Sequence, residues 1–324
     1  MPTDSATKTC LVIGGAGFIG THLCRAIASG RDDLQLTVLD DLSGSAVDRE
    51  RFRTLVPKAD LIVGDGAAPP RRVRETGWDL IIHLASACGP VAVLAEAGRI
   101  GPATLDILQS TIALARAAGG RLIYVSTSEV YGSAGDVDEA SPAVFGARAS
   151  ARQEYALSKR LAETVLENAW QVDPAAFSYQ IVRPFNVAGP LQRADKGFVM
   201  PRFIAQARAD APLTVYGDGA QRRAFLHVED ACRALIALAG AQTCNRTWNL
   251  GCAGNTLSIR DLALRVIDRV GAGRLDFVDP VALHGAAFSD APSKIPAGPL
   301  RIEALGWAAR RDIDAIIDDI RHAL

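Results

Sequence analysis

The chain has 324 residues, with 35 lysines and arginines against 36 aspartates and glutamates, so its formal net charge at pH 7 is only −1. That length is sufficient for one large α/β domain with a smaller lobe, or for two domains. Balanced charge without a long basic run disfavours nucleic acid or an anionic membrane as the main partner, and the six scattered cysteines form no pair or cluster with zinc spacing, so we expect no metal site.

The first residues of the chain, 1–8, are polar and lack the apolar core of a signal peptide. No apolar stretch of the sequence is long enough to span a bilayer. We therefore expect a soluble, cytoplasmic protein that does not bind membranes.

A glycine-rich turn follows the first apolar run, where Gly14, Gly17 and Gly20 lead into a helical pattern. Glycine permits a tight turn and close backbone approach to a ligand, and a helix N-terminus offers free N–H groups. Such turns also occur for packing. Here, however, Asp40 ends the next apolar run about 20 residues on, where a carboxylate would accept hydrogen bonds from an adenosine ribose. The combination favours binding of a dinucleotide over a purely structural turn.

Short apolar runs alternate with helical patterns through the first half of the chain. This alternation is typical of a parallel sheet covered by helices on both faces, so we predict an α/β fold with a Rossmann-type doubly wound sheet. The expected strands span residues 9–13, 36–39, 61–63, 80–84, 122–126 and 179–182, and the expected helices span residues 18–29, 103–118 and 152–170.

The pattern changes after Arg183, where residues 185–219 are rich in glycine, proline and arginine. We expect residues 1–183 to form the dinucleotide-binding domain. Residues 184–324 should form mainly a smaller α/β substrate-binding lobe, with some elements returning to the main sheet. Helical patterns in this part span residues 199–208, 230–239, 258–270 and 310–322, the third opening with Ser258 and Asp261 like a capping box.

Tyr155 and Lys159 stand four residues apart on a predicted helix and therefore share a face. A lysine ammonium beside a phenol favours the phenolate, as does the positive charge of an oxidised nicotinamide. Tyr155 could then act as a general base at a sugar hydroxyl, with its pKa lowered. The same spacing is also common on ordinary surface helices.

Hydroxyls and a carboxylate follow the strand predicted at residues 122–126, namely Ser126, Thr127, Ser128 and Glu129. Ligands of open parallel sheets bind at this end of the strands, so a hydroxyl here could share the substrate proton with Tyr155. Alternatively, these hydroxyls satisfy backbone groups in a turn.

In their order and spacing these motifs resemble an extended short-chain dehydrogenase/reductase of the NAD-dependent nucleotide-sugar epimerase/dehydratase family. The resemblance covers residues 9–307, and it is specific for the family but not for the substrate. The matching motifs are Gly14-x-x-Gly17-x-x-Gly20, Asp40-Asp41-Leu42-Ser43, Asp65, His83-Leu84-Ala85, Ser126-Thr127-Ser128-Glu129-Val130-Tyr131-Gly132, Tyr155-x-x-x-Lys159, Arg183-Pro184-Phe185-Asn186-Val187 and Tyr216-Gly217-Asp218-Gly219.

The resemblance implies that Tyr155 removes the proton from the sugar 4-hydroxyl, while Thr127 hydrogen-bonds that oxygen. Lys159 would bind the nicotinamide ribose and tune Tyr155, and hydride would pass from C4 to NAD. No arginine directly follows Asp40, which favours NAD over NADP. The implied cofactor-binding residues are Gly14, Gly17, Phe18, Ile19, Gly20, Asp40, Asp41, Ser43, Asp65, Gly66, Leu84, Ala85, Ser86, Tyr155 and Lys159.

Asn186 and Arg223 match positions that contact the nucleotide-sugar substrate, although they could also be a loop cap and a solvated charge. Two segments depart from the family pattern. Thr104 and the pair at residues 107–108 replace an Asn and a Gly-Thr pair, and residues 294–297 replace an Arg/Lys-x-Pro-Asp element. The resemblance also implies a homodimer, in which the helices at residues 103–118 and 152–170 pair with their copies.

The reaction that follows C4 oxidation is open. An epimerase needs only room for the 4-keto sugar to turn over, whereas a dehydratase or decarboxylase needs another acid or base, for which Glu129 is the candidate. Glu129 could equally be structural. We expect a UDP-hexose 4-epimerase, with a UDP-glucuronate decarboxylase or a nucleotide-sugar 4,6-dehydratase as enzyme alternatives. The non-enzyme alternative is an NAD-binding regulatory protein.

Overall fold

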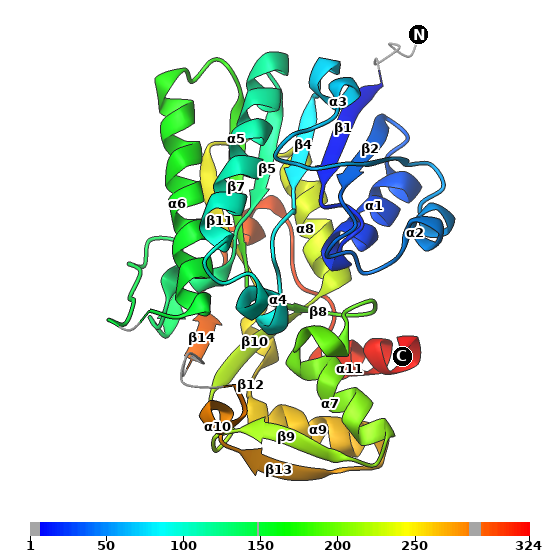
Figure 1. Cartoon of the computed structure of the whole chain (residues 1–324), viewed down its shortest axis with the longest axis vertical. Helices are drawn as coiled ribbons and strands as arrows, with labels where there is room; N and C mark the ends of the chain where they lie inside the picture. The colour runs from blue at the N-terminus through cyan, green and yellow to red at the C-terminus, as the bar shows by residue number, and fades with distance from the viewer. Residues whose placement is uncertain (1–6, 148, 285–292) are drawn as a thin grey trace.

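A computed structural model describes residues 7–147, 149–284 and 293–324. Its largest element is a seven-stranded parallel sheet in the order β11-β7-β5-β4-β1-β2-β3 (Figure 1), which confirms the predicted Rossmann-type sheet. Every predicted strand is present, and β11 joins the edge without having been predicted. The strands are β1 (Lys8–Ile13), β2 (Leu34–Asp40), β3 (Asp60–Val63), β4 (Leu80–His83), β5 (Arg121–Val125), β7 (Ser178–Pro184) and β11 (Arg246–Leu250).

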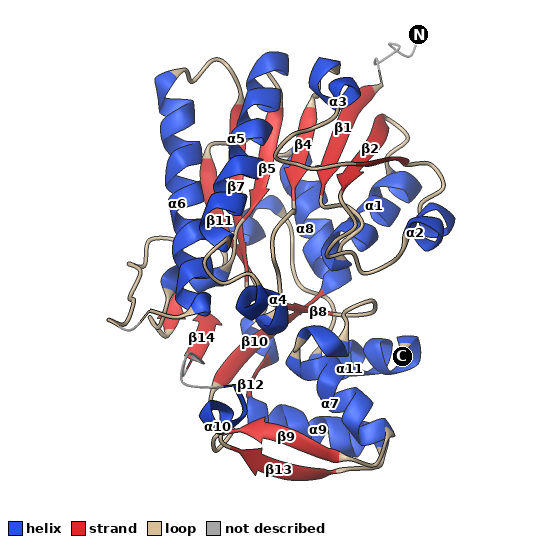
Figure 2. Ribbon diagram, in the orientation of Figure 1, coloured by secondary structure: helices blue, strands red, loops and turns tan. Residues whose placement is uncertain are grey.

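Helices cover both faces of this sheet (Figure 2). Successive side chains of a strand point to opposite faces. In β1, Cys10 and Val12 join one apolar core, and Leu11 and Ile13 join the other. The first core is shared with α1 (Phe18–Gly30), α2 (Arg49–Leu55) and α8 (Val228–Gly240), and the second with α3 (Arg71–Glu75), α5 (Ile100–Ala118) and α6 (Ala151–Val172).

Local hydrogen bonds fix the ends of the long helices. Ser150 begins α6, because its Oγ accepts a hydrogen bond from the Gln153 N–H at 3.1 Å. Gly119 ends α5 in a left-handed conformation, with φ of 62°. None of the helices in the described ranges is long and apolar enough to cross a membrane.

The predicted serine cap is present at the start of α9 (Ile259–Val270). The Oγ of Ser258 accepts a hydrogen bond from the Asp261 N–H at 3.0 Å and donates one to the Asp261 carboxylate at 2.7 Å. One free N–H of the first helical turn is thereby satisfied, and the carboxylate holds the serine hydroxyl in place.

A smaller lobe lies below the main sheet in Figure 1. It holds a sheet in the order β12-β10-β14-β6, with β8 paired to β10, and a separate pair of β13 with β9. Helices α7, α9 and α11 enclose its apolar core. Its elements are β6 (Asp136–Val137), β8 (Asn186–Ala188), α7 (Val199–Arg208), β9 (Pro212–Tyr216), β10 (Arg222–His227), β12 (Thr256–Ser258), β13 (Arg274–Val278), α10 (Pro280–His284), β14 (Ser293–Pro296) and α11 (Ile313–Ala323).

Short helices complete the chain between these elements. One of them, α4, lies between the main sheet and the smaller lobe in Figure 1. They are α4 (Pro90–Ala95) and the 3-10 helices η1 (Ser128–Tyr131), η2 (Ala194–Lys196), η3 (Ala253–Asn255) and η4 (Arg301–Leu305).

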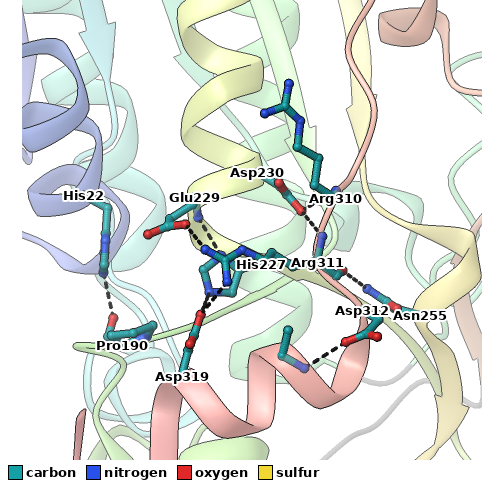
Figure 3. A network of polar contacts seen from close by, with 11 residues as sticks. His22, Pro190, His227, Glu229, Asp230, Asn255, Arg310, Arg311, Asp312 and Asp319 are labelled. Atoms are coloured by element: carbon teal, nitrogen blue, oxygen red, sulfur yellow. Dashed lines mark hydrogen bonds and ion pairs between the residues drawn. The ribbon is translucent and has the colours of Figure 1, made fainter. Parts of the chain in front are cut away.

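A network of polar side chains fastens the end of the chain to the start of α8 (Figure 3). The buried carboxylate of Asp230 accepts a hydrogen bond from the Arg311 N–H at 3.0 Å. The Arg311 guanidinium lies 2.8 Å from Glu229 and 3.3 Å from Asp319. His227 caps α8 by accepting from the Glu229 N–H at 3.1 Å, and its other ring nitrogen lies 3.2 Å from Asp319. The smaller lobe is therefore held to a helix of the main domain.

Candidate active site

Apart from Tyr155 and Lys159 on α6, the residues predicted to bind the cofactor lie at or just after the carboxyl ends of neighbouring strands. Because these strands are parallel, the segments after them meet at one edge of the sheet. The assignment of these residues to NAD stays a prediction. They are Gly14, Gly17, Phe18, Ile19 and Gly20 after β1, Asp40, Asp41 and Ser43 at the end of β2, Asp65 and Gly66 after β3, and Leu84, Ala85 and Ser86 after β4.

The turn after β1 requires glycine. Gly14 has a φ of +81°, and a Cβ added to it would lie 2.6 Å from the backbone nitrogen of Ala85. Gly17 stands at the N-cap of α1 and supplies no capping side chain. The first N–H groups of that helix therefore face the strand-end edge without a side-chain cap, as anion binding requires.

Asp40 is 8% exposed and holds the glycine turn in place. Its two carboxylate oxygens accept hydrogen bonds from the N–H groups of Ala16 and Leu42, each at 2.8 Å. Burial raises the pKa of Asp40, and these two hydrogen bonds oppose the rise. The Asp40 carboxylate therefore fixes the shape of the turn, independently of any hydrogen bond that it accepts from a ribose.

The remaining predicted cofactor residues lie in well-formed turns. Asp41 accepts hydrogen bonds from the N–H and hydroxyl of Ser43, at 2.9 and 2.7 Å. Asp65 is exposed and accepts from the Ala67 N–H at 2.8 Å. The hydroxyl of Ser110, from α5, donates to the Gly66 carbonyl. The Asp65 carboxylate is therefore accessible at the strand-end edge of the main sheet.

The structure brings Thr127, Tyr155 and Lys159 together beyond the end of β5. Thr127 caps η1 and also hydrogen-bonds to the phenol of Tyr155. Lys159 is 1% exposed, and its ammonium donates to the Val125 carbonyl at 3.1 Å. It also lies 4.8 Å from the centre of the Tyr124 ring. Thr127 therefore lies at Tyr155, and Lys159 lies four residues further along α6; the roles assigned to these three side chains stay a prediction.

The predicted lowering of the Tyr155 pKa is wrong when only the protein's own groups act on the phenol. Burial raises the pKa of Tyr155, Cys88 and Glu129 add to the rise, and hydrogen bonds with Thr127 and Ser86 only oppose it. Burial also lowers the pKa of Lys159 to about 8. A lysine on the same helix face cannot offset the loss of hydration at a buried phenol, which disfavours the charged form.

Glu129 lies at the centre of a charged cluster. Its carboxylate receives the Arg152 guanidinium in a fork, at 2.8 Å from Nε to Oε2 and 3.1 Å from Nη2 to Oε1. The Lys294 ammonium forms an ion pair with the same carboxylate. Burial works to raise the pKa of Glu129, but the charges of Lys294 and Arg152 outweigh it and hold the pKa well below its usual range. These charges therefore favour the ionised form of Glu129 at neutral pH.

Lys294 is 2% exposed and reaches this cluster from the smaller lobe. It lies on β14, where it pairs in register with Arg223 of β10. Burial lowers the pKa of Lys294 to about 8, and the charges of Arg152 and Arg223 lower it further while Glu129 opposes them. One of the two cationic groups that pair with Glu129 thus comes from a strand of the smaller lobe, with Arg223 beside it on the neighbouring strand.

The other predicted site residues have more ordinary contacts. Ser128, 4% exposed, opens η1. The hydroxyl of Ser126 donates to the buried Glu163 carboxylate at 2.6 Å. Asn186, on β8, donates to the Ala224 carbonyl at 3.2 Å and so joins β8 to β10. No group of three or more His, Cys, Asp or Glu side chains in the described ranges could hold a metal ion.

Arg152 was missed by the sequence analysis, and Lys294 was noted there without a role. The position of Arg152, three residues before Tyr155, places both on one helix face and could have identified it. No periodic pattern links residues 129 and 294, because the pairing of β14 with β10 and β6 brings them together.

A sequence model of the NAD dependent epimerase/dehydratase family matches residues 10–251. Among similar proteins, a UDP-N-acetyl-alpha-D-glucosaminuronate decarboxylase of Bacillus cytotoxicus is 32% identical over 262 residues, which are 79% of this chain and 78% of that protein. A UDP-glucuronic acid decarboxylase 1 of Arabidopsis thaliana is 31% identical over 263 residues, 80% of this chain and 58% of that protein. The solved structure of a dTDP-glucose 4,6-dehydratase from Streptomyces venezuelae, with NAD bound, has a TM-score of 0.80 and 27% identity, over 97% of this chain and 96% of that one.

Proposed function

The chain belongs to the NAD dependent epimerase/dehydratase family, and from that premise we propose that it removes the carboxylate of a nucleotide-linked uronic acid as CO2. It is an enzyme of nucleotide-sugar metabolism with NAD as its cofactor. The glycine turn at Gly14, the uncapped start of α1 and the strand-end carboxylate of Asp40 fit this cofactor. NAD, when bound, supplies the acceptor for the hydride that leaves C4 of the sugar.

The observation that carries this proposal is the pairing of both Arg152 and Lys294 with Glu129, with Arg223 in register beside Lys294 on the neighbouring strand. Two cationic side chains thus meet one carboxylate. Cations in a partly buried site stabilise an anion that binds beside them. The carboxylate of a uronic acid is such an anion, and arginine suits it because the guanidinium fork donates two parallel hydrogen bonds.

The residues near Tyr155 would prepare the sugar for loss of CO2. The positive charge of the oxidised nicotinamide, when bound, would oppose the effect of burial and favour the phenolate of Tyr155. Tyr155 would then accept the proton of the 4-hydroxyl, with Thr127 hydrogen-bonded to the same oxygen and Lys159 charged nearby. The resulting C4 ketone is β to the C6 carboxylate. When the C5–C6 bond breaks, its electron pair moves into a C4–C5 enolate whose oxygen is held by Tyr155 and Thr127.

The similar decarboxylases from Bacillus cytotoxicus and Arabidopsis thaliana support this choice over the UDP-hexose 4-epimerase favoured by the sequence. A neutral hexose would bring no negative charge to Arg152 and Lys294. A 4,6-dehydratase would need a group that exchanges a proton near C6, whereas Glu129 is held ionised by its two partners. A regulatory role without catalysis does not account for the gathering of Thr127, Tyr155 and Lys159 at one edge.

The test is incubation of the purified protein with NAD and, in separate reactions, UDP-glucuronate, UDP-N-acetylglucosaminuronate and UDP-glucose. Mass spectrometry of the nucleotide product should show loss of CO2 from one of the uronates. A new epimer of unchanged mass, seen by NMR, would replace the proposal with epimerisation, and loss of water would replace it with dehydration. Tyr155→Phe, which removes only the phenolic oxygen, should abolish turnover and leave the NAD content unchanged.

A further inference from the structure

We propose that Glu154 is a positioning residue for the phenol of Tyr155, because its carboxylate fastens the start of α5 to the part of α6 that carries Tyr155. The inference rests on oxidation of the sugar at C4, a step that the proposed decarboxylation shares with epimerisation and dehydration. It concerns a side chain to which the sequence analysis assigned no role.

The carboxylate of Glu154 closes the N-terminus of α5. Its Oε1 accepts hydrogen bonds from the N–H groups of Ile100 at 3.0 Å and Gly101 at 3.4 Å. Its Oε2 accepts one from the Gly98 N–H at 2.6 Å. The first N–H groups of a helix have no partners within the helix, and a negative charge beside them is favourable. A residue of α6 therefore supplies the cap of α5.

The sequence of α5 provides no cap of its own. Arg99, at the N-cap position, makes no capping hydrogen bond with its side chain. Pro102 has no N–H to satisfy, and Ala103 donates to the Arg99 carbonyl at 3.2 Å. The first two N–H groups of α5 thus depend on Glu154, so loss of this carboxylate should free the start of the helix.

The segment between β4 and α5 forms a wall beside Tyr155. Ile100 and Val93 are 2% and 8% exposed and form an apolar cluster with Ala151. The Tyr155 side chain packs against this cluster. Near the other end of the segment, Ser86 hydrogen-bonds to the Tyr155 phenol. The same stretch of chain therefore contacts both the ring and the hydroxyl of Tyr155.

This wall sets two properties of Tyr155. It fixes the place of the phenol oxygen, and a base displaced by a small distance loses much of its effect. It also excludes water from the phenol, and burial raises the pKa of Tyr155. Without the Glu154 carboxylate the α5 end of the wall comes free, so the phenol should become both less well placed and better hydrated.

The deciding experiment compares wild type with Glu154→Ala and Glu154→Gln as NAD-loaded enzymes, using a nucleotide sugar that the wild type converts. In Glu154→Ala, hydrogen exchange should become faster at the amides of Gly98, Ile100 and Gly101. We expect kcat to fall by about tenfold to a hundredfold while KM changes by less than about threefold. Glu154→Gln keeps an oxygen that can accept from Ile100 and Gly101, so its kcat should stay within about threefold of wild type.

The matched control is Gln153→Ala. Gln153 precedes Glu154, and its side chain also bonds to a backbone group, donating to the Gly146 carbonyl at 2.9 Å. That partner lies in the loop before α6 and not at the start of α5. Gln153→Ala should therefore change neither kcat nor hydrogen exchange at Ile100.

The pH dependence of kcat separates positioning from a simple loss of stability. Tyr155 acts as a base only when ionised, so kcat should rise as pH rises through its pKa in the loaded enzyme. Because burial raises that pKa, hydration of the phenol in Glu154→Ala should lower it and move the rise to lower pH. Cys88 and Glu129, which also raise the pKa, are unchanged in this variant. A loss of stability alone would leave the rise where it is in wild type.

A second variant perturbs the wall without removing the cap. Ile100→Val removes one methyl group from the apolar cluster and leaves Glu154 in place. It should move the rise of kcat in the same direction as Glu154→Ala, by a smaller amount. If Glu154→Ala does not fold, Ile100→Val decides, and a wild-type kcat with an unmoved rise in that variant would overturn the inference.

Three results for the Glu154 variants would also overturn it. Faster exchange with an unchanged kcat would make Glu154 a structural cap only, and unchanged exchange would mean that no such cap exists. A kcat for Glu154→Gln as low as that for Glu154→Ala would assign the effect to charge instead of hydrogen bonds. Conversion of the sugar without loss of CO2 defeats the proposed function alone, and the variants are then compared in that reaction. A wild type that oxidises no nucleotide sugar defeats both.

Discussion

Glu163 offers the sharpest test of how the strand-end edge is supported. Its carboxylate is fully buried and accepts hydrogen bonds from Ser126 at 2.6 Å and from Arg183 at 2.9 and 2.6 Å. Arg183 is itself only 4% exposed. Glu163→Gln leaves that guanidinium buried without its counter-charge, and breaking a buried pair from one side costs about 3–5 kcal/mol. Because the amide retains some hydrogen bonds, we expect a loss of about 3 kcal/mol.

The assay is urea unfolding at a fixed NAD concentration, since bound ligand adds to stability. A loss of this size should lower the transition midpoint without a change in slope. The matched control is Arg160→Met, which removes another partner of the Glu163 carboxylate. The Arg160 side chain is 45% exposed. Exposed pairs contribute less than about 1 kcal/mol. The double variant Glu163→Gln/Arg183→Met should lose less than the sum of the single changes. A loss below about 1 kcal/mol for Glu163→Gln would refute this reasoning.

Two further predictions concern the cofactor turn and the assembly. Gly14→Ala places an alanine in a left-handed conformation, with its Cβ against the Ala85 backbone. It should lower the free energy of unfolding by about 2–4 kcal/mol and weaken NAD binding measured by calorimetry. The control Gly44→Ala has nothing within 4 Å of the added Cβ, so it should change neither quantity. The predicted homodimer should place the exposed face of α6 in its interface, and Leu161, 49% exposed, should then be critical. Sedimentation at micromolar concentration should show a dimer that Leu161→Asp converts to monomer, and a monomeric wild type would contradict the prediction.

The main sheet could be predicted from the sequence because its strands carry their own pattern. Both faces of β1 and β4 are covered, so these strands are continuous apolar runs such as Leu11 to Ile13. The strands of the smaller lobe carry no such pattern. β6 has two residues and β14 has four, and both exist only through pairing with strands far along the chain. A segment this short has no periodicity to detect.

The residues of the candidate site also differ in whether the sequence could predict their positions. Thr127, Tyr155 and Lys159 could be placed together because each lies on an element whose direction the sequence indicates. The pKa of Tyr155 could not, since helix spacing describes neighbours but not burial, and burial dominates here. The same helix spacing could have predicted that Arg152 lies at the site, but it could not have predicted this for Lys294.

This difference between the main domain and the smaller lobe explains why the reaction was harder to predict than the family. The residues expected to act at C4 stand at the same edge of the main sheet as Gly14 and Asp40. Of the two cations that pair with Glu129, Arg152 lies on α6 of the main domain, whereas Lys294 lies on β14 of the smaller lobe. Glu129 looks like an acid or base in the sequence, but these two cations hold its pKa well below its usual range. In the proposed decarboxylation, the step after C4 oxidation therefore depends on a charge that β14 brings to a carboxylate of the main domain.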